Sequence, residues 1–99
     1  MKMKQGRVPF SVVGLGGRAS AYLNALQEFY PNEYQVVAVA DPDPVKQARA
    51  RDEYGLQDNQ IFNTDLALME ESRLSDVAMI ATQDKLHLRD IRGLLAKGY

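Results

Sequence analysis

Short apolar runs alternate with amphipathic helical patterns along this chain. Two of the runs, Val36–Ala40 and Val77–Ala81, are rich in valine and alanine and are bounded by polar or turn residues. Each run predicts a strand that is buried on both faces, as in a parallel sheet. Val8–Val13, which contains a proline and a serine, and the short Ile61–Phe62 are two further candidate strands.

Helical patterns follow the first two predicted strands in chain order, Val8–Val13 and Val36–Ala40. Apolar residues recur at three- and four-residue steps over residues 19–29, and Pro31 ends this pattern. The second pattern begins with Asp43 as its N-cap, next to a proline, and ends before Gly55. Both patterns predict helices that connect neighbouring strands.

Two more helices are predicted in the second half of the chain. Leu66–Glu71 is a short candidate. A longer one runs from Asp84, as its cap, to Gly98, and its spacing places His87 and Ile91 on one face. Strands and helices therefore alternate from the first run to the last helix.

This alternation predicts an α/β fold, a doubly wound parallel sheet with right-handed crossovers. Val36–Ala40 and Val77–Ala81 should lie, nearly fully buried, on either side of Val8–Val13, which gives the strand order 3-2-1-4. A further strand would ordinarily follow Tyr99. We therefore interpret the chain as the front portion of a longer protein or as a short natural version. The open edge at Val77–Ala81 favours association into a homo-oligomer.

Composition excludes several classes of protein. The 99 residues, 45% apolar and 25% charged, fit one ordinary globular domain. The absence of cysteine excludes a disulfide scaffold and a thiolate metal site, and a single histidine, His87, argues against a histidine metal centre. The longest apolar runs are far shorter than the roughly 20 residues of a membrane span. We expect a soluble, cytoplasmic protein with no membrane partner.

Charge is distributed unevenly along the chain. Residues 1–7 carry three basic residues and no acid, so residues 8–99 hold nine basic and 13 acidic residues, a net charge of −4. This acidic body argues against a nucleic-acid partner, because a basic surface supplies most of the affinity for nucleic acid.

A glycine-rich turn follows the first predicted strand. The segment Val12-Val13-Gly14-Leu15-Gly16-Gly17-Arg18-Ala19 fits the pattern G-x-G-x-x-A. Gly14 allows a tight turn, Gly16 lets backbone approach a pyrophosphate, and Ala19 lets the helix pack closely on the strand. Backbone amides at the helix start would then face the phosphates. The candidate cofactor-binding residues here are Gly14, Leu15, Gly16, Gly17, Arg18 and Ala19; the alternative is a tight turn in another α/β protein.

An acid ends the second predicted strand. Asp41 lies 22 residues after Ala19, where dinucleotide-binding folds place a carboxylate that accepts hydrogen bonds from the adenosine ribose. The alternative role of Asp41 is that of a turn residue before Pro42. The spacing favours the ribose role.

The same acid bears on the choice of cofactor. A carboxylate at Asp41 repels a 2′-phosphate and so favours NAD over NADP, although Arg18 and Lys46 would soften that preference. Methyltransferases share the glycine turn and the acid, but usually place another acid just before the glycines. Val12–Val13 occupies that stretch here, which argues against a methyltransferase.

The segment around the last predicted strand resembles a known family. Asp76-Val77-Ala78-Met79-Ile80-Ala81-Thr82-Gln83-Asp84-Lys85-Leu86-His87 is similar to the D-x-V-x-I-x-T-P-N-x-x-H pattern of the glucose–fructose oxidoreductase/inositol dehydrogenase (Gfo/Idh/MocA) family. With the glycine turn and Asp41, the resemblance spans residues 8–99. Gln83 stands where the family usually has Pro, and Asp84 where it usually has Asn.

The resemblance implies cofactor contacts for four more residues, which are Thr82, Gln83, Asp84 and His87. Each of three has an alternative: Thr82 as a buried residue that closes the strand, Asp84 as the helix cap, and His87 as a helix residue that packs toward Ile91.

The resemblance also implies a function. Members of the family are NAD(P)-dependent oxidoreductases that transfer a hydride between a nicotinamide cofactor and a sugar, cyclitol or related hydroxyl compound. Their Glu-Lys-Pro segment, whose lysine is implicated in proton transfer, and their substrate domain would lie beyond Tyr99. We therefore expect a basic tail (1–7), an incomplete dinucleotide-binding domain (8–99), no catalytic residue in this chain, and a small-molecule substrate bound through the missing domain.

Two other functions stay open at this point. One is a stand-alone dinucleotide-binding or sensing module without catalysis. The other is a binding domain for a different adenine nucleotide.

Overall fold

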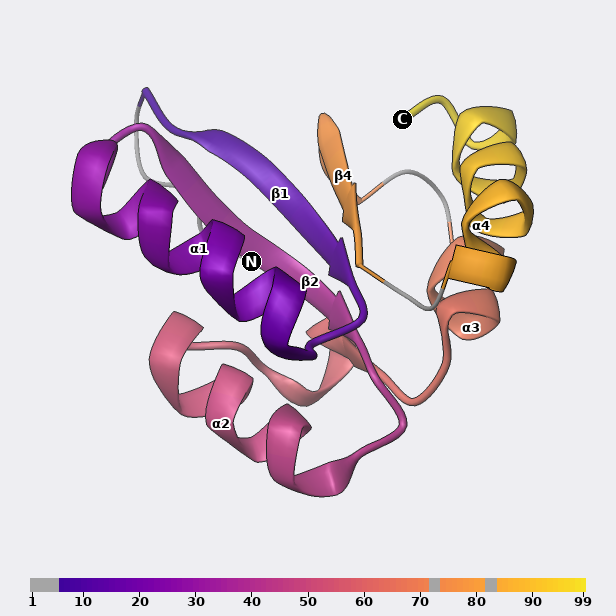
Figure 1. Cartoon of the computed structure of the whole chain (residues 1–99), viewed down its shortest axis with the longest axis horizontal. Helices are drawn as coiled ribbons and strands as arrows, with labels where there is room; N and C mark the ends of the chain where they lie inside the picture. Colours follow the sequence, from indigo (N-terminus) through magenta and orange to yellow (C-terminus); the bar gives the residue numbers. More distant parts are fainter. Residues whose placement is uncertain (1–5, 72–73, 82–83) are drawn as a thin grey trace.

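Four parallel strands form one sheet, with helices on both of its faces (Figure 1). The computed structural model describes residues 6–71, 74–81 and 84–99, without the side chains of Arg18 and residues 84–88. The elements are β1 (Val8–Val13), α1 (Gly17–Phe29), β2 (Tyr34–Ala40), α2 (Pro44–Tyr54), a 3₁₀ turn (Asp58–Gln60), β3 (Ile61–Phe62), α3 (Asp65–Glu70), β4 (Val77–Ile80) and α4 (Asp84–Ala96). The strand order is β3-β2-β1-β4, which confirms the predicted doubly wound topology.

The predicted burial of the outer strands is correct for β2 and wrong for β4. All residues of β2 except Gln35 are buried. In β4, by contrast, Val77 is 37% exposed and the other three residues are only partly buried. The reason is that β4 pairs with β1 and forms an edge of the sheet within the described residues.

Local sequence signals set the ends of α2 and α3. The Asp43 side chain accepts a hydrogen bond from the Val45 backbone N–H at 2.9 Å, and Gly55 ends α2 with a φ of 65°. Both roles were predicted. Helix α3 begins at Asp65, one residue before the predicted start, because Thr64 caps it by accepting from the Ala67 N–H at 3.0 Å.

The last helix begins one residue earlier than expected. Asp84 was predicted to be the N-cap, whereas the structure includes it in α4 as the first helical residue. The helix ends at Ala96, and Gly98 follows with a φ of 92°. None of the helices in the described ranges has the length and apolar character that a membrane span requires.

The two faces of the sheet carry separate cores. On the side of α1 and α2, Val12 and Val39 are fully buried with Ala19 of α1. On the side of α3 and α4, Val13 packs with Leu68 and Leu94. Side chains of neighbouring residues in a strand point to opposite faces of the sheet, so β1 and β2 pack into both cores. This packing continues up to the carboxyl ends of the two strands. The loops that follow these strands therefore start from a rigid base.

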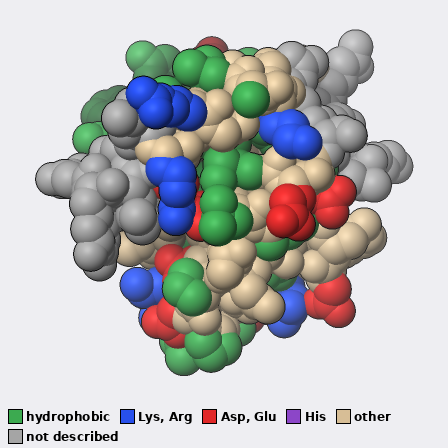
Figure 2. Space-filling model, turned by 90° about the vertical axis from the view of Figure 1, so that its right-hand side faces the viewer, with side chains coloured by type: hydrophobic (Ala, Val, Ile, Leu, Met, Phe, Trp, Pro, Cys, Tyr) green, Lys and Arg blue, Asp and Glu red, His purple; other side chains and the backbone are tan. Residues whose placement is uncertain are grey.

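The side of the molecule that carries α4 exposes apolar side chains. A band of hydrophobic side chains lies there between basic and acidic ones (Figure 2). A groove of about 260 Å³ runs between β4 and α4, and Ile91 and Leu95 on its rim are 42% and 64% exposed. Association through this edge stays a prediction.

Candidate functional site

A crevice of about 490 Å³ opens at the carboxyl ends of the strands. The carboxyl ends of parallel strands lie at the same edge of the sheet. The strand order reverses between β1 and β4, so the loops that follow these two strands run in opposite directions and leave a crevice between them. The crevice is lined by Gly14, Gly16, Ala40, Asp41, Pro42, Asp43, Lys46, Asn63, Thr64, Asp65 and Ala81. The predicted glycine turn and the predicted acid thus share one site.

The glycine turn leads from β1 into α1 with its backbone facing this crevice. Gly14 has a φ of 89°, a left-handed conformation that favours glycine, and its N–H donates to the Ala40 carbonyl at 2.8 Å. Gly16 is the N-cap of α1, and a Cβ atom placed on it would meet nothing within 4 Å. Ala19 is fully buried against the sheet, as the motif predicts.

The start of α1 suits an anion. Gly16 carries no side chain to accept from the amides of the first turn, and that turn holds no acidic residue. The backbone N–H groups and the positive end of the helix dipole at this terminus, beside Gly16 of the crevice, therefore meet no carboxylate of the helix's own first turn. Gly17 and Arg18 belong to this turn, but the Arg18 side chain is outside the described structure.

Asp41 faces the glycine turn from the end of β2. Only 7% of the residue is exposed. Its Oδ2 accepts from the Leu15 N–H and its Oδ1 from the Asp43 N–H, both at 2.8 Å. The turn role considered from the sequence is therefore present. A carboxylate has about four acceptor positions, so two remain for further donors such as hydroxyl groups.

The residues expected near the nicotinamide end are only partly described. Thr82 and Gln83 lie outside the described residues. Asp84 and His87 belong to the first turn of α4, but their side chains are not described. Ala81, which precedes them, lines the crevice and donates its N–H to the Val13 carbonyl at 2.7 Å. The roles of all four residues stay predictions.

Sequence reasoning missed a third wall of the crevice, formed by Asn63, Thr64 and Asp65. The Gln47 Nε2 group holds this wall to the second strand, since it donates to Oδ1 of Asn63 at 2.9 Å and to the Asp41 carbonyl at 2.5 Å. The signal was available, because these residues directly follow the short strand β3 and residues in that position face the ligand crevice.

The charged residues that line the crevice are Asp41, Asp43, Asp65 and Lys46. Three carboxylates and one ammonium group thus line the crevice, and one of the carboxylates, that of Asp65, is paired with Arg89. Among the described residues, no group of three or more metal-binding side chains is close enough to hold a metal ion.

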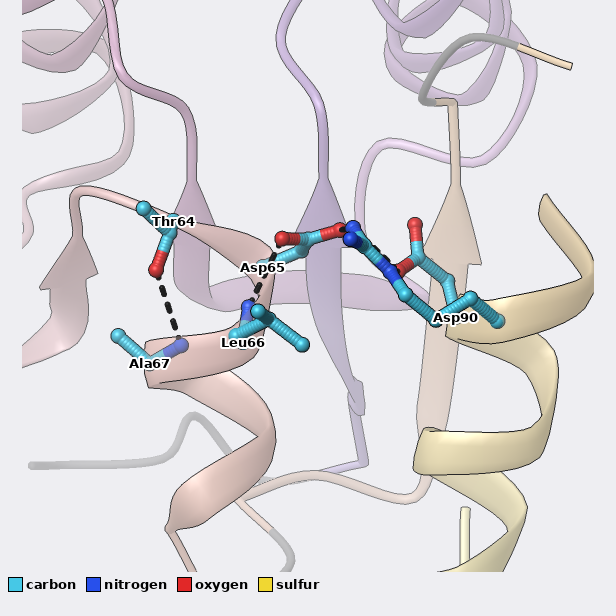
Figure 3. Close-up of polar contacts among 6 residues, drawn as sticks. Thr64, Asp65, Leu66, Ala67 and Asp90 are labelled. Carbon is cyan, nitrogen blue, oxygen red and sulfur yellow. Dashed lines mark hydrogen bonds and ion pairs between the residues drawn. The ribbon is translucent and has the colours of Figure 1, made fainter. Parts of the chain in front are cut away.

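An ionic contact joins α3 to α4 beside the crevice (Figure 3). Arg89 donates to Oδ2 of Asp65 and, at 3.4 Å, to Oδ1 of the fully buried Asp90. Oδ1 of Asp65 also accepts from the Leu66 N–H at 2.8 Å. Burial would raise the pKa of Asp65, but its hydrogen bonds with Asp90, Leu66 and Arg89 outweigh burial and hold the pKa below its ordinary value.

This lowered pKa predicts a pH dependence of stability. The ionised form of Asp65 stabilises the fold above the unfolded pKa of about 3.9, and this stabilisation is lost as the pH falls through the lower folded pKa. The Asp65→Asn variant should therefore be less stable than the parent at about pH 6, and the difference should shrink toward about pH 3. Urea unfolding across this range measures it.

The matched control is Asp58→Asn, which removes the ion pair of Arg51 with Asp58, at 2.9 Å and with Asp58 92% exposed. Exposed pairs contribute little, so this variant should follow the parent at every pH. A constant difference between Asp65→Asn and the parent from pH 6 to pH 3 would contradict the assignment.

Comparison with known proteins points to one family. Residues 8–99 match the Gfo/Idh/MocA family, described as an oxidoreductase family with an NAD-binding Rossmann fold. No curated protein matches the chain.

Solved structures share the fold. The WlbA dehydrogenase from Chromobacterium violaceum, in complex with NADH and UDP-GlcNAcA, is 18% identical with a TM-score of 0.80, over 98% of this chain and 27% of that one. The apo scyllo-inositol dehydrogenase from Lactobacillus casei is 20% identical with a TM-score of 0.78, over 97% and 27%. A putative dehydrogenase from Bordetella bronchiseptica is 25% identical with a TM-score of 0.74, over 93% and 23%. The chain spans about a quarter of the length of these structures.

Proposed function

Because this chain belongs to the Gfo/Idh/MocA family of oxidoreductases with an NAD-binding Rossmann fold, we propose that its crevice holds a nicotinamide dinucleotide. The observation that carries the proposal is the meeting of two features in one crevice. One is the α1 terminus, where the N-cap Gly16 leaves open space. The other is the largely buried carboxylate of Asp41, which keeps two acceptor positions.

The two features divide the cofactor between them. Backbone amides of residues 16–19 would bind the pyrophosphate, since they lie at the positive end of the α1 dipole. Asp41 would accept hydrogen bonds from the adenosine ribose hydroxyls. The bound dinucleotide supplies a nicotinamide that carries a hydride, and the chain's own residues bind and orient it.

We further propose that NAD is preferred over NADP. The 2′-phosphate of NADP would lie near the carboxylates of Asp41 and Asp43, and these negative charges would repel it. Lys46 in the same crevice would offset part of this repulsion. The chain should therefore bind NAD more tightly than NADP, by less than the two carboxylates alone would produce.

The other end of the cofactor is assigned from the family resemblance. Thr82, Gln83, Asp84 and His87 would lie near the nicotinamide half. Ala81, the residue before them, lines the crevice, and this supports the placement of the segment.

The reaction proposed for the whole protein is hydride transfer between the cofactor and a sugar, cyclitol or related hydroxyl compound. Two of the similar structures are a scyllo-inositol dehydrogenase and a dehydrogenase in complex with a nucleotide sugar, UDP-GlcNAcA. We propose that residues 1–99 contribute cofactor binding and that the substrate is held by a further part of the protein. Hydride transfer needs a substrate carbon held against the nicotinamide and a group that exchanges the hydroxyl proton.

This division of roles predicts binding without turnover for residues 1–99 alone. The chain should bind NADH, seen as a change in nicotinamide fluorescence, with NAD as a competitor. With NAD and a panel of polyols it should produce no NADH absorbance. A longer version of the protein that includes a downstream Glu-Lys-Pro segment should show turnover.

Two results would change the proposal. NADH formation by residues 1–99 that depends on His87 would place catalysis in this chain. A longer version that binds NADH but turns over no polyol would favour a dinucleotide-sensing module.

A further inference from the structure

Asp41 forms hydrogen bonds with other parts of the chain through both its backbone and its carboxylate. Its N–H donates to the Phe62 carbonyl at 3.0 Å, and its carbonyl accepts from Gln47 Nε2 at 2.5 Å. The carboxylate accepts from the Leu15 and Asp43 amides, each at 2.8 Å. The residue therefore joins β2 to β3, to α2 and to the glycine turn.

The contact with Leu15 is notable because of where Leu15 lies. It stands between Gly14, with its positive φ, and Gly16, the N-cap of α1. Glycine residues have more conformational freedom than any other, so a turn built on them needs contacts from outside to hold one shape. The Asp41 carboxylate supplies such a contact at the centre of the turn.

The orientation of this turn decides whether the pyrophosphate can bind. The amides of residues 16–19 serve as anion donors only when the chain enters α1 along the path that the structure shows. If the turn populates other shapes, the apparent affinity falls by the fraction of molecules that keep the competent one.

We propose that Asp41 is a positioning residue for the pyrophosphate site, in addition to its role as a ribose ligand. Its Oδ2 fixes the Leu15 amide and thereby the glycine turn, so loss of the carboxylate weakens phosphate binding even where no ribose hydroxyl is present. This inference rests on the proposed function for its ligand. The bond between Asp41 and Leu15 can also be tested without any ligand.

The binding test compares ADP with 2′,3′-dideoxy-ADP, which lacks both ribose hydroxyls. Calorimetric titration gives their affinities for residues 1–99 and for the Asp41→Ala and Asp41→Asn variants. A residue that only binds ribose would leave the dideoxy affinity unchanged on substitution. A positioning residue lowers it, here by about fivefold for Asp41→Ala. Asp41→Asn, which keeps one carbonyl oxygen as an acceptor, should lose less.

The ligand-free test follows the Leu15 amide by NMR. A hydrogen bond to a carboxylate shifts an amide proton downfield and slows its exchange with solvent. Asp41→Ala should move the Leu15 proton upfield and speed its exchange, and Asp41→Asn should restore part of the protection. Asp52→Ala, which removes an exposed carboxylate from α2, is the matched control and should change neither property.

The outcomes are distinct. A lower dideoxy-ADP affinity with an altered Leu15 amide supports the positioning role. Unchanged dideoxy-ADP affinity, or a Leu15 amide that is the same in Asp41→Ala as in the parent, overturns it. If the parent binds neither nucleotide, the proposed function fails, and the Leu15 measurement alone decides whether Asp41 fixes the turn.

Discussion

The Gly16→Val variant is expected to bind NADH at least about 100-fold more weakly than the parent chain, because the pyrophosphate would lose charge-assisted hydrogen bonds to backbone amides. A Cβ atom at Gly16 meets no protein atom within 4 Å, so the new side chain would enter the crevice rather than the core. It would occupy the space in front of the α1 terminus that the phosphates need. Titration of nicotinamide fluorescence measures the loss.

The same observation predicts an intact fold. The φ of Gly16 is −74°, which any residue adopts, so valine introduces no backbone strain there. The unfolding temperature should stay within about 3 °C of the parent value. Ala21→Val adds similar bulk at an exposed position of α1 and should leave binding unchanged. Retention of parent-like NADH affinity by Gly16→Val would show that the phosphates bind elsewhere.

The Asp41→Ala variant is expected to weaken NAD binding by about 1–3 kcal/mol, which is about fivefold to 150-fold. The loss combines the hydrogen bonds to the ribose hydroxyls with the disturbed glycine turn. NADP should lose less, because removal of the carboxylate also removes its repulsion of the 2′-phosphate. The affinity ratio of NAD to NADP should therefore narrow, and competition titrations with both cofactors measure it.

Asp52→Ala is again the control, since it removes one carboxylate far along α2 and should alter neither affinity. An Asp41→Ala variant that binds NAD as well as the parent does would remove the ribose assignment. An unchanged ratio of NAD to NADP would instead show that Asp41 does not set the cofactor preference.

The order of strands and helices was predictable because each element carries its own local signal. The structure also explains how β1 accommodates Pro9 and Ser11, two residues that are unusual in a buried strand. Pro9 precedes the stretch that pairs with β4, which begins at Phe10, so its missing N–H interrupts no bond of that ladder. Ser11 is fully buried but shares a hydrogen bond of 2.6 Å with the Ser75 hydroxyl. The sequence pattern could not show this pairing, because the two residues lie 64 positions apart.

Site residues that belong to a sequence motif with a fixed spacing could be predicted. Site residues that only the fold brings together could not. Gly16 and Asp41 follow the two strands with a recognised spacing, and the structure places both in one crevice. Asn63 follows a strand of only two residues, which gives little periodic signal. Asp90 lies on an amphipathic helix, and its complete burial arises only where the fold packs α4 against α3 and β4.

Chemical-shift mapping of NADH on residues 1–99 shows directly whether the crevice at the carboxyl ends of the strands binds the dinucleotide. In amide NMR spectra recorded during titration, we expect the largest changes on the glycine turn and the start of α1, residues 14–19, and on residues 41–43; Gly14, Gly16 and residues 41–43 line the crevice. No change on addition of NADH would show that the crevice does not bind the dinucleotide. So would changes centred at the opposite end of the sheet, on the polar pocket around Arg7 and Tyr34.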